Sequence, residues 1–161
     1  MADLEAVARH VLEACAAANL TLATAESCTG GLIAAALTAI PGSSAWVERG
    51  FVTYANEAKA EMLGVPMDMI ERFGAVSEPV ARAMAEGALT HSRASVSVAV
   101  TGIAGPGGGS AEKPVGTVHI AAARQGQPTL HRHCLFSGDR DAVRQASVLA
   151  AMRLLIERCA G

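Results

Sequence analysis

A serine beside a pair of glycines is the first feature of this sequence that suggests nucleophilic chemistry. Ser27 follows the apolar run at residues 20–25 and precedes Gly30 and Gly31. A strand that turns into a helix through small residues exposes a hydroxyl at the end of a sheet, as in a nucleophile elbow, although the G-x-S-x-G pattern is absent. Unpaired N–H groups at the helix start could then face an anion or a developing oxyanion. An ordinary serine-capped helix start, with glycines for close packing, would give the same pattern.

Serine is a weak nucleophile without a neighbouring base, and the sequence offers few candidates for that base. The histidines all lie away from the polar turns that would form a site: His10, His91, His119, His131 and His133. Lysine can replace histidine where burial or a neighbouring cation lowers its pKa from about 10.4 toward neutrality. Lys59 comes just after a predicted strand that ends at Tyr54, so it could face the same crevice as Ser27. It could equally be an exposed helix charge between Glu57 and Glu61.

A second candidate for ligand binding is the glycine-rich stretch that follows the predicted strand at residues 95–101. Thr101 and Gly102 stand at the end of this strand, where open α/β sheets place their ligands. The glycines at residues 105–109 match neither the P-loop nor the dinucleotide-binding motif. They could form a plain surface loop or a loop that closes over a ligand, and the sequence does not separate the two.

Apolar periodicity and turn residues divide the chain into alternating helices and strands. Helices are predicted at residues 3–19, 30–40, 78–92 and 139–158, a helical turn at 67–73, and strands at 20–25, 47–54, 95–101, 115–123 and 130–136. Asn56 is predicted to cap a short helix that ends at Gly64, and Ser77 to cap the helix at 78–92. The alternation predicts one three-layer α/β/α domain over residues 1–161, with a mixed, mostly parallel five-stranded sheet that ends in an antiparallel hairpin.

Composition excludes several classes of protein and partner. Charged residues make up 17% of the 161 residues, against 51% hydrophobic ones, so we expect a homo-oligomer, with a dimer favoured, to bury part of the surface. The net charge of −2 and the absence of a basic run argue against nucleic-acid binding. No apolar run approaches the ~20 residues of a membrane span, and the start does not resemble a signal peptide. We therefore expect a cytoplasmic protein that has no membrane partner.

Metal binding is not expected. The cysteines share no C-x-x-C spacing, which indicates free thiols: Cys15, Cys28, Cys134 and Cys159. His131 and His133 would lie on one face of a strand, but no clear third ligand accompanies them. The sequence thus predicts neither a metal site nor a cofactor.

Four segments, in order, resemble the CinA C-terminal domain family, and the likeness extends over nearly the whole chain. They are AESCTGG at 25–31, VTYANEAK at 52–59, GAVS at 74–77 and TGIAGPGG at 101–108. Standalone members of this family are nicotinamide mononucleotide deamidases. The resemblance thus implies hydrolysis of a nucleotide carboxamide to nicotinic acid mononucleotide and ammonia, within pyridine nucleotide recycling.

The resemblance also implies a role for individual residues. Ser27 would be the nucleophile of a metal-free serine amidase, Lys59 its base, and Tyr54 a residue that relays or holds the proton. Residues around the substrate would be Thr29, Gly30 and Gly31 at the oxyanion and carboxamide pocket, with Ser44, Thr101 and Gly102 beside them. Arg140 would bind the phosphate near the start of the last helix, with Arg144 as the alternative. Two other functions stay open: a nucleotide-binding or regulatory module without turnover, and an amidase for another small amide.

Overall fold

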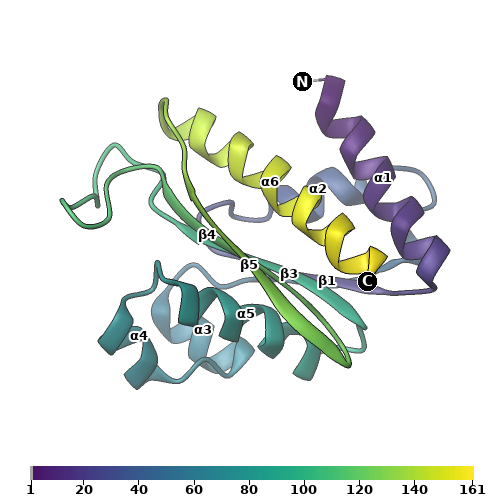
Figure 1. Cartoon of the computed structure of the whole chain (residues 1–161), viewed down its shortest axis with the longest axis horizontal. Coiled ribbons are helices and arrows are strands. Elements are labelled where there is room, and N and C mark those ends of the chain that lie inside the picture. Colours follow the sequence, from purple (N-terminus) through teal and green to yellow (C-terminus); the bar gives the residue numbers. More distant parts are fainter. Residues whose placement is uncertain (1) are drawn as a thin grey trace.

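The computed structural model describes residues 2–161, which form three layers around one sheet (Figure 1). The helices are α1 (Ala2–Ala18), α2 (Leu32–Thr38), α3 (Asn56–Leu63), α4 (Met67–Phe73), α5 (Glu78–Thr90) and α6 (Arg140–Ala160), with a short 3₁₀ helix η1 at Ser43–Ala45. The strands are β1 (Leu22–Glu26), β2 (Val47–Val52), β3 (Val96–Gly102), β4 (Thr117–Arg124) and β5 (Gln127–Leu135). Helices α1, α2 and α6 cover one face of the sheet, and α3, α4 and α5 cover the other.

The strand order in the sheet is β2-β1-β3-β4-β5. β1 pairs in parallel with both β2 and β3, whereas β4 pairs antiparallel with β3 and with β5. Four strands therefore run in one direction, and β4 alone runs against them. The carboxyl ends of β2, β1 and β3 consequently meet at one edge of the sheet, where open α/β sheets form their ligand crevice.

The two faces of the sheet carry different side chains. Toward α1 and α6 the central strands present large aliphatic residues such as Leu22, Val98 and Ile120, all fully buried. Toward α5 they present alanines such as Ala25, Ala99 and Ala121. Because alanine adds little thickness, α5 can pack close to the sheet on that side, and strand alternation produces this division directly.

The structure confirms the predicted three-layer fold with a mixed five-stranded sheet, although its neighbouring strands form two parallel and two antiparallel pairs. The cap at Ser77 is confirmed, since its hydroxyl accepts a hydrogen bond from the N–H of Val80. The cap at Asn56 was wrong: Asn56 is the first residue of α3, and Ala55 occupies the cap position. That residues 1–161 form a single domain, and that the protein is a cytoplasmic homo-oligomer, stay predictions. Within residues 2–161 no helix is long and apolar enough to span a bilayer.

Candidate active site

Ser27 and Lys59 come together at the carboxyl ends of the parallel strands. Ser27 follows β1 directly, Lys59 lies in the helix that follows β2, and Thr101 is near the end of β3. They line a cleft of about 290 Å³. The other lining residues are Cys28, Tyr54, Asn56, Ala75, Val76, Gly102, Ile103, Ala104, Gly105, Gly107, Gly108 and Arg140.

Lys59 is held by three oxygen atoms. Its Nζ lies 3.1 Å from Ser27 Oγ, 2.9 Å from the carbonyl oxygen of Thr53 and 3.3 Å from that of Tyr54. The side chain is 1% exposed, and it forms no ion pair with any of the residues described. The amine is therefore surrounded by neutral groups, so the alternative reading of Lys59 as an exposed helix charge was wrong.

Burial lowers the pKa of Lys59 below its ordinary value, because a buried ammonium loses its hydration. Cys28 would oppose this effect as a thiolate. Burial, however, raises the pKa of the Cys28 thiol to about 11, so at neutral pH this thiol carries no charge. The Lys59 amine is thus biased toward the neutral form that can accept a proton.

Close packing of two helices fixes the position of Lys59. Helix α3 has only eight residues, and its last residue, Leu63, lies one turn beyond Lys59. The Leu63 carbonyl rests against Gly87 in the last turn of α5, and a Cβ at Gly87 would overlap that carbonyl oxygen. The absence of a side chain at Gly87 therefore allows α3 to lie where Lys59 reaches Ser27.

Glu26 is the important residue that sequence reasoning missed. Its carboxylate is fully buried at the end of β1 and accepts hydrogen bonds from the N–H groups of Gly31, Ile33 and Ala34, at 3.2, 3.0 and 3.0 Å. The start of α2 thus binds an anion supplied by the chain itself, and the expectation that these N–H groups face an external anion was wrong. A glutamate as the last residue of an apolar strand was the available signal.

The turn after Ser27 differs from the predicted pocket wall. Gly30 and Gly31 adopt positive φ angles of 59° and 105°, which explains why α2 begins only at Leu32. Thr29 is completely buried, and its hydroxyl has no hydrogen-bond partner among the described residues. None of these three residues lines the cleft that contains Ser27. Gly30 and Gly31 instead shape the turn that follows Ser27.

Tyr54 and Arg140 meet at the cleft. Arg140, the first residue of α6, donates from Nη2 to the Tyr54 hydroxyl at 3.1 Å and from Nη1 to the carbonyl oxygen of Gly105 at 2.7 Å. Tyr54 is 62% exposed, and only its backbone carbonyl contacts Lys59. Arg140 is thus placed to receive an anion at the cleft, whereas the Tyr54 hydroxyl bonds to Arg140 rather than to Ser27 or Lys59.

Thr101 and Gly102 lie in the cleft, as the sequence suggested, and the Thr101 hydroxyl donates to the carbonyl oxygen of Ala75 at 2.9 Å. Three glycines of the loop after β3 also line the cleft: Gly105, Gly107 and Gly108. Ser44 does not join this group. It is exposed in η1, ahead of β2, and therefore lies toward the opposite end of the parallel strands.

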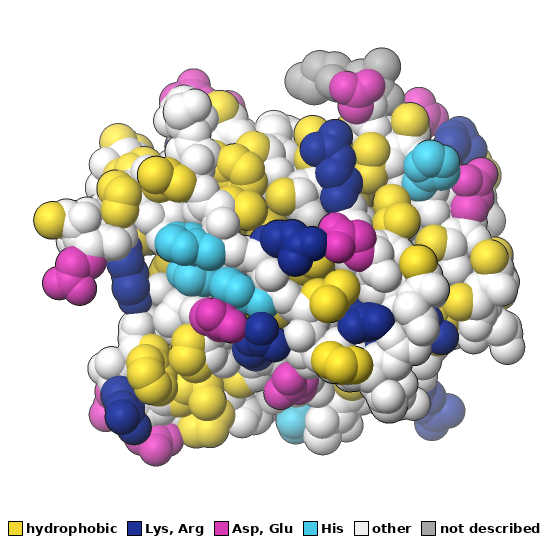
Figure 2. All heavy atoms as spheres, viewed as in Figure 1, with side chains coloured by type: hydrophobic (Ala, Val, Ile, Leu, Met, Phe, Trp, Pro, Cys, Tyr) yellow, Lys and Arg dark blue, Asp and Glu magenta, His cyan; other side chains and the backbone are white. Residues whose placement is uncertain are grey.

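The predicted pair, His131 and His133, forms a cluster with His119. Figure 2 shows histidine side chains gathered on the face of the molecule that it views. His119 of β4 stacks on His133 and lies with its Nδ1 2.9 Å from Nε2 of His131. Burial lowers the pKa of His119 to about 4. Among the described residues there is no group of three or more ligands arranged to hold a metal ion.

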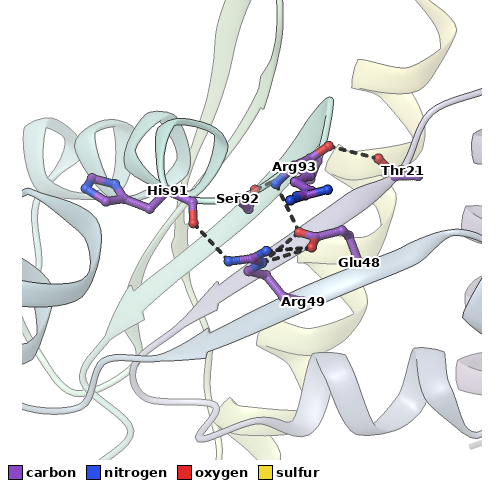
Figure 3. A network of polar contacts seen from close by, with 7 residues as sticks. Thr21, Glu48, Arg49, His91, Ser92 and Arg93 are labelled. Atoms are coloured by element: carbon purple, nitrogen blue, oxygen red, sulfur yellow. Dashed lines mark hydrogen bonds and ion pairs between the residues drawn. The ribbon is translucent and has the colours of Figure 1, made fainter.

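A separate polar network lies at the amino ends of the parallel strands (Figure 3). Arg49 on β2 donates to the neighbouring Glu48 carboxylate at 2.8 Å and to the carbonyl oxygen of His91 at 3.3 Å. The Glu48 carboxylate also accepts from the N–H of Arg93, just ahead of β3. The Arg49 guanidinium is therefore paired with the carboxylate of the adjacent Glu48.

Comparisons with known proteins identify the family of this chain. The family model described as the CinA C-terminal domain matches residues 4–159. The chain is 53% identical, over 95% of its length and 93% of the relative's, to nicotinamide-nucleotide amidohydrolase PncC of Escherichia coli K12. It is 55% identical, over 86% of its length, to a CinA-like protein of Akkermansia muciniphila, covering 34% of that longer chain.

Solved structures give the same result. The crystal structure of the competence/damage inducible protein CihA from Agrobacterium tumefaciens superposes with a TM-score of 0.94 at 53% identity, over 97% of this chain and 95% of that one. A CinA superfamily protein from Klebsiella pneumoniae superposes with a TM-score of 0.92 at 38% identity, over 98% of both chains. With sequence and fold in agreement, this chain belongs to the CinA C-terminal domain family.

Proposed function

We propose that this chain hydrolyses the carboxamide of nicotinamide mononucleotide to nicotinic acid mononucleotide and ammonia, as a step of pyridine nucleotide recycling. The name of the Escherichia coli relative, 53% identical, supports the substrate. One observation carries the chemistry: the buried Lys59 amine lies 3.1 Å from Ser27 Oγ and forms no ion pair with a carboxylate of residues 2–161. This pair provides a nucleophile together with its base.

As an ammonium Lys59 can donate to all three oxygens, and as the neutral amine that the reaction needs it can keep two of these bonds and reverse the third. A neutral amine has two N–H donors and one lone pair, whereas an ammonium has three donors and no acceptor. The carbonyl oxygens of Thr53 and Tyr54 can take the two N–H groups. The lone pair then faces the Ser27 hydroxyl, which donates its proton to it.

In the first half of the proposed reaction, Ser27 Oγ forms a bond to the carboxamide carbon while its proton passes to Lys59 Nζ. The carbonyl oxygen becomes an oxyanion that backbone N–H groups of the turn stabilise. The C–N bond then breaks, Lys59 returns the proton to the leaving nitrogen, and ammonia departs. An ester between Ser27 and the nicotinoyl group remains.

In the second half, water attacks the ester carbon and gives a proton to Lys59. The C–O bond to Ser27 breaks, Lys59 reprotonates Ser27 Oγ, and nicotinic acid mononucleotide leaves. The pyridinium ring withdraws electrons from the carbonyl in both halves, which suits a modest nucleophile. These steps consume only water.

Arg140 is proposed as the phosphate ligand, since its guanidinium reaches the cleft from the start of α6, where the helix dipole favours anions. To bind phosphate it would exchange its present contact with Tyr54. The proposed mechanism passes the proton directly between Lys59 and the leaving nitrogen, and the Tyr54 hydroxyl, which bonds to Arg140, relays no proton.

The decisive experiment measures ammonia and nicotinic acid mononucleotide together, after adding nicotinamide mononucleotide to the purified protein. Equal amounts of both products support the proposal. Binding measured by calorimetry without any product would show a nucleotide-binding module instead. Turnover of other small amides with nicotinamide mononucleotide left intact would assign a different amidase substrate.

A further inference from the structure

Arg144 contacts the turn behind Ser27, not the open cleft. It lies in α6, one turn after Arg140, and is partly buried. Its Nε donates to the carbonyl oxygen of Cys28 at 3.1 Å, and its Nη2 to that of Thr29 at 3.4 Å. Arg140 lines the cleft, whereas Arg144 does not. Its guanidinium is therefore occupied with the backbone.

Most other backbone groups of this turn are bonded within the chain. The N–H of Ser27 donates to the carbonyl oxygen of Val100 at 3.0 Å, and the N–H of Gly30 to that of Ser27 at 3.0 Å. The N–H of Gly31 donates to Glu26. Within residues 2–161, the N–H groups of Cys28 and Thr29 are the amides of this turn that have no acceptor.

Peptide geometry connects these free donors to Arg144. The carbonyl of Cys28 and the N–H of Thr29 belong to one planar trans peptide unit, so they point in opposite directions. A guanidinium that holds the Cys28 oxygen therefore fixes where the Thr29 N–H points. The charge also polarises this peptide unit and makes its N–H a stronger donor.

We propose that Arg144 is a positioning residue for the amide hydrolysis proposed above, on which this inference rests. By holding the Cys28 carbonyl, it aims the N–H of Thr29 at the oxygen that becomes the oxyanion. The N–H of Cys28, whose peptide unit is anchored by the bond from Gly30 to Ser27, is the second donor. Arg144 thus acts in the transition state and does not bind the phosphate.

The test compares Arg144→Gln with Arg153→Gln, an exposed arginine on the same helix. Loss of a whole oxyanion donor costs about 10²–10³-fold in kcat, so a misaimed donor should cost roughly 10–10²-fold. We expect Arg144→Gln to lower kcat by that factor, with KM unchanged within about twofold, since the interaction forms only in the transition state. Arg144→Lys, which can still hold one carbonyl, should recover part of the loss, and Arg153→Gln should leave kcat unchanged.

A substrate without phosphate separates the two roles of an arginine. Nicotinamide riboside should show the same fold loss in kcat/KM with Arg144→Gln as the nucleotide does. A rise in KM confined to the phosphate-bearing substrate would overturn the proposal, and so would unchanged kinetics on both substrates. If Arg144→Gln does not fold, Arg144→Lys takes its place in this comparison.

An activated ester keeps this test independent of the natural substrate. The rate at which p-nitrophenyl acetate acylates Ser27 depends on the oxyanion donors but not on a nicotinamide ring. Arg144→Gln should slow that acylation by a similar factor even if wild-type protein releases no ammonia from nicotinamide mononucleotide, the outcome that would refute the proposed function alone. Equal acylation rates in wild type and variant, or no acylation of Ser27, would overturn the role of Arg144.

Discussion

The two ends of the parallel strands each hold a cation, and they treat it in opposite ways. At the amino end, Arg49 is partly exposed, with its Glu48 carboxylate at 2.8 Å (Figure 3). Its hydrogen bond lowers the pKa of Glu48, so both groups stay charged. At the carboxyl end, Lys59 is buried among neutral oxygens, and burial lowers its pKa. Each cation also bonds to a backbone carbonyl, so the carboxylate and the exposure to water make the difference.

This contrast indicates where chemistry can occur. A charged group that is paired and hydrated keeps its ordinary protonation state. An ammonium that is buried without a counter-ion is destabilised and loses its proton more readily. The second case costs folding free energy, and it favours the neutral amine that can act as a base. The same sheet thus combines a structural end and a reactive end, and each can be altered separately.

The largest effect on kcat is expected from removing the hydroxyl of Ser27, the partner of Lys59. Ser27→Ala should lower kcat by at least about 10³-fold, since no other group can form the acyl intermediate. Cys28→Ala should retain most activity, because its buried thiol stays protonated at neutral pH. Ammonia release by both variants is the measurement. An inactive Cys28→Ala beside an active Ser27→Ala would make this a cysteine amidase.

The second-largest effect on kcat is expected from replacing Lys59 with arginine, which stays charged as Arg49 does. Lys59→Arg keeps a cation but cannot supply a neutral base, so kcat should fall by roughly 10²–10⁴-fold, nearly as far as with Lys59→Ala. In the wild type, kcat/KM should rise with pH through the lowered pKa of Lys59, because only the neutral amine accepts the proton. Lys113→Arg is the matched control, as Lys113 bonds a carbonyl oxygen on the surface. Near-normal turnover by folded Lys59→Arg would remove Lys59 from the mechanism.

A smaller effect should appear in stability. The pKa of Lys59 is lower in the folded chain than in the unfolded chain, so the unfolded state binds more protons between these two values. The cost of burying the ammonium is therefore full below the folded pKa and disappears as pH rises past the unfolded value. At pH 7, Lys59→Met should therefore have a higher Tm than the wild type, by about 2–4 °C for each kcal/mol of burial cost that the substitution removes. At pH 10.5 this difference in Tm should be smaller. Thermal unfolding at both pH values measures it, and a difference independent of pH would contradict it.

The smallest effect is expected at the structural end. Glu48→Gln removes the counter-charge of Arg49 at the surface, so Tm should fall only slightly and kcat should not change. Because the pKa of Glu48 is lowered, its contribution is present above the unfolded value and lost as pH falls through the folded one. The difference in Tm between variant and wild type should thus shrink as pH is lowered from 7. A clear loss of ammonia release would show that the two ends are coupled.

Sequence reasoning found what depends on strand ends and on family likeness. Residues after neighbouring parallel strands meet at one edge, so Ser27, Lys59 and Thr101 could be expected to converge. The hydrogen bonds that the Glu26 side chain makes could not be predicted in the same way. Glu26 caps α2 from the end of β1, and this contact depends on how α2 packs on the sheet, which no local pattern encodes.

The prediction for Ser44 failed because it did not consider whether the residue comes before or after its neighbouring strand. Ser44 precedes a strand instead of following it, so it lies at the wrong end of the sheet, although its small polar surroundings look like a binding loop. Gly30 and Gly31 were expected to admit a substrate to the backbone. Their positive φ angles serve the turn itself, and Gly31 gives its N–H to Glu26.

The contact between Gly87 and Leu63 has a consequence for variant screening. Exchanging a glycine within a helix for alanine ordinarily raises helix stability by up to about 1 kcal/mol, so Gly87→Ala would be chosen by any stabilisation scheme based on helix propensity. Here the added methyl group would press on the carbonyl at the end of α3 and shift the helix that carries Lys59. A design scheme based on helix propensity alone would thus introduce a substitution that costs stability and separates amine from hydroxyl, at a position outside any scan restricted to the residues that line the cleft.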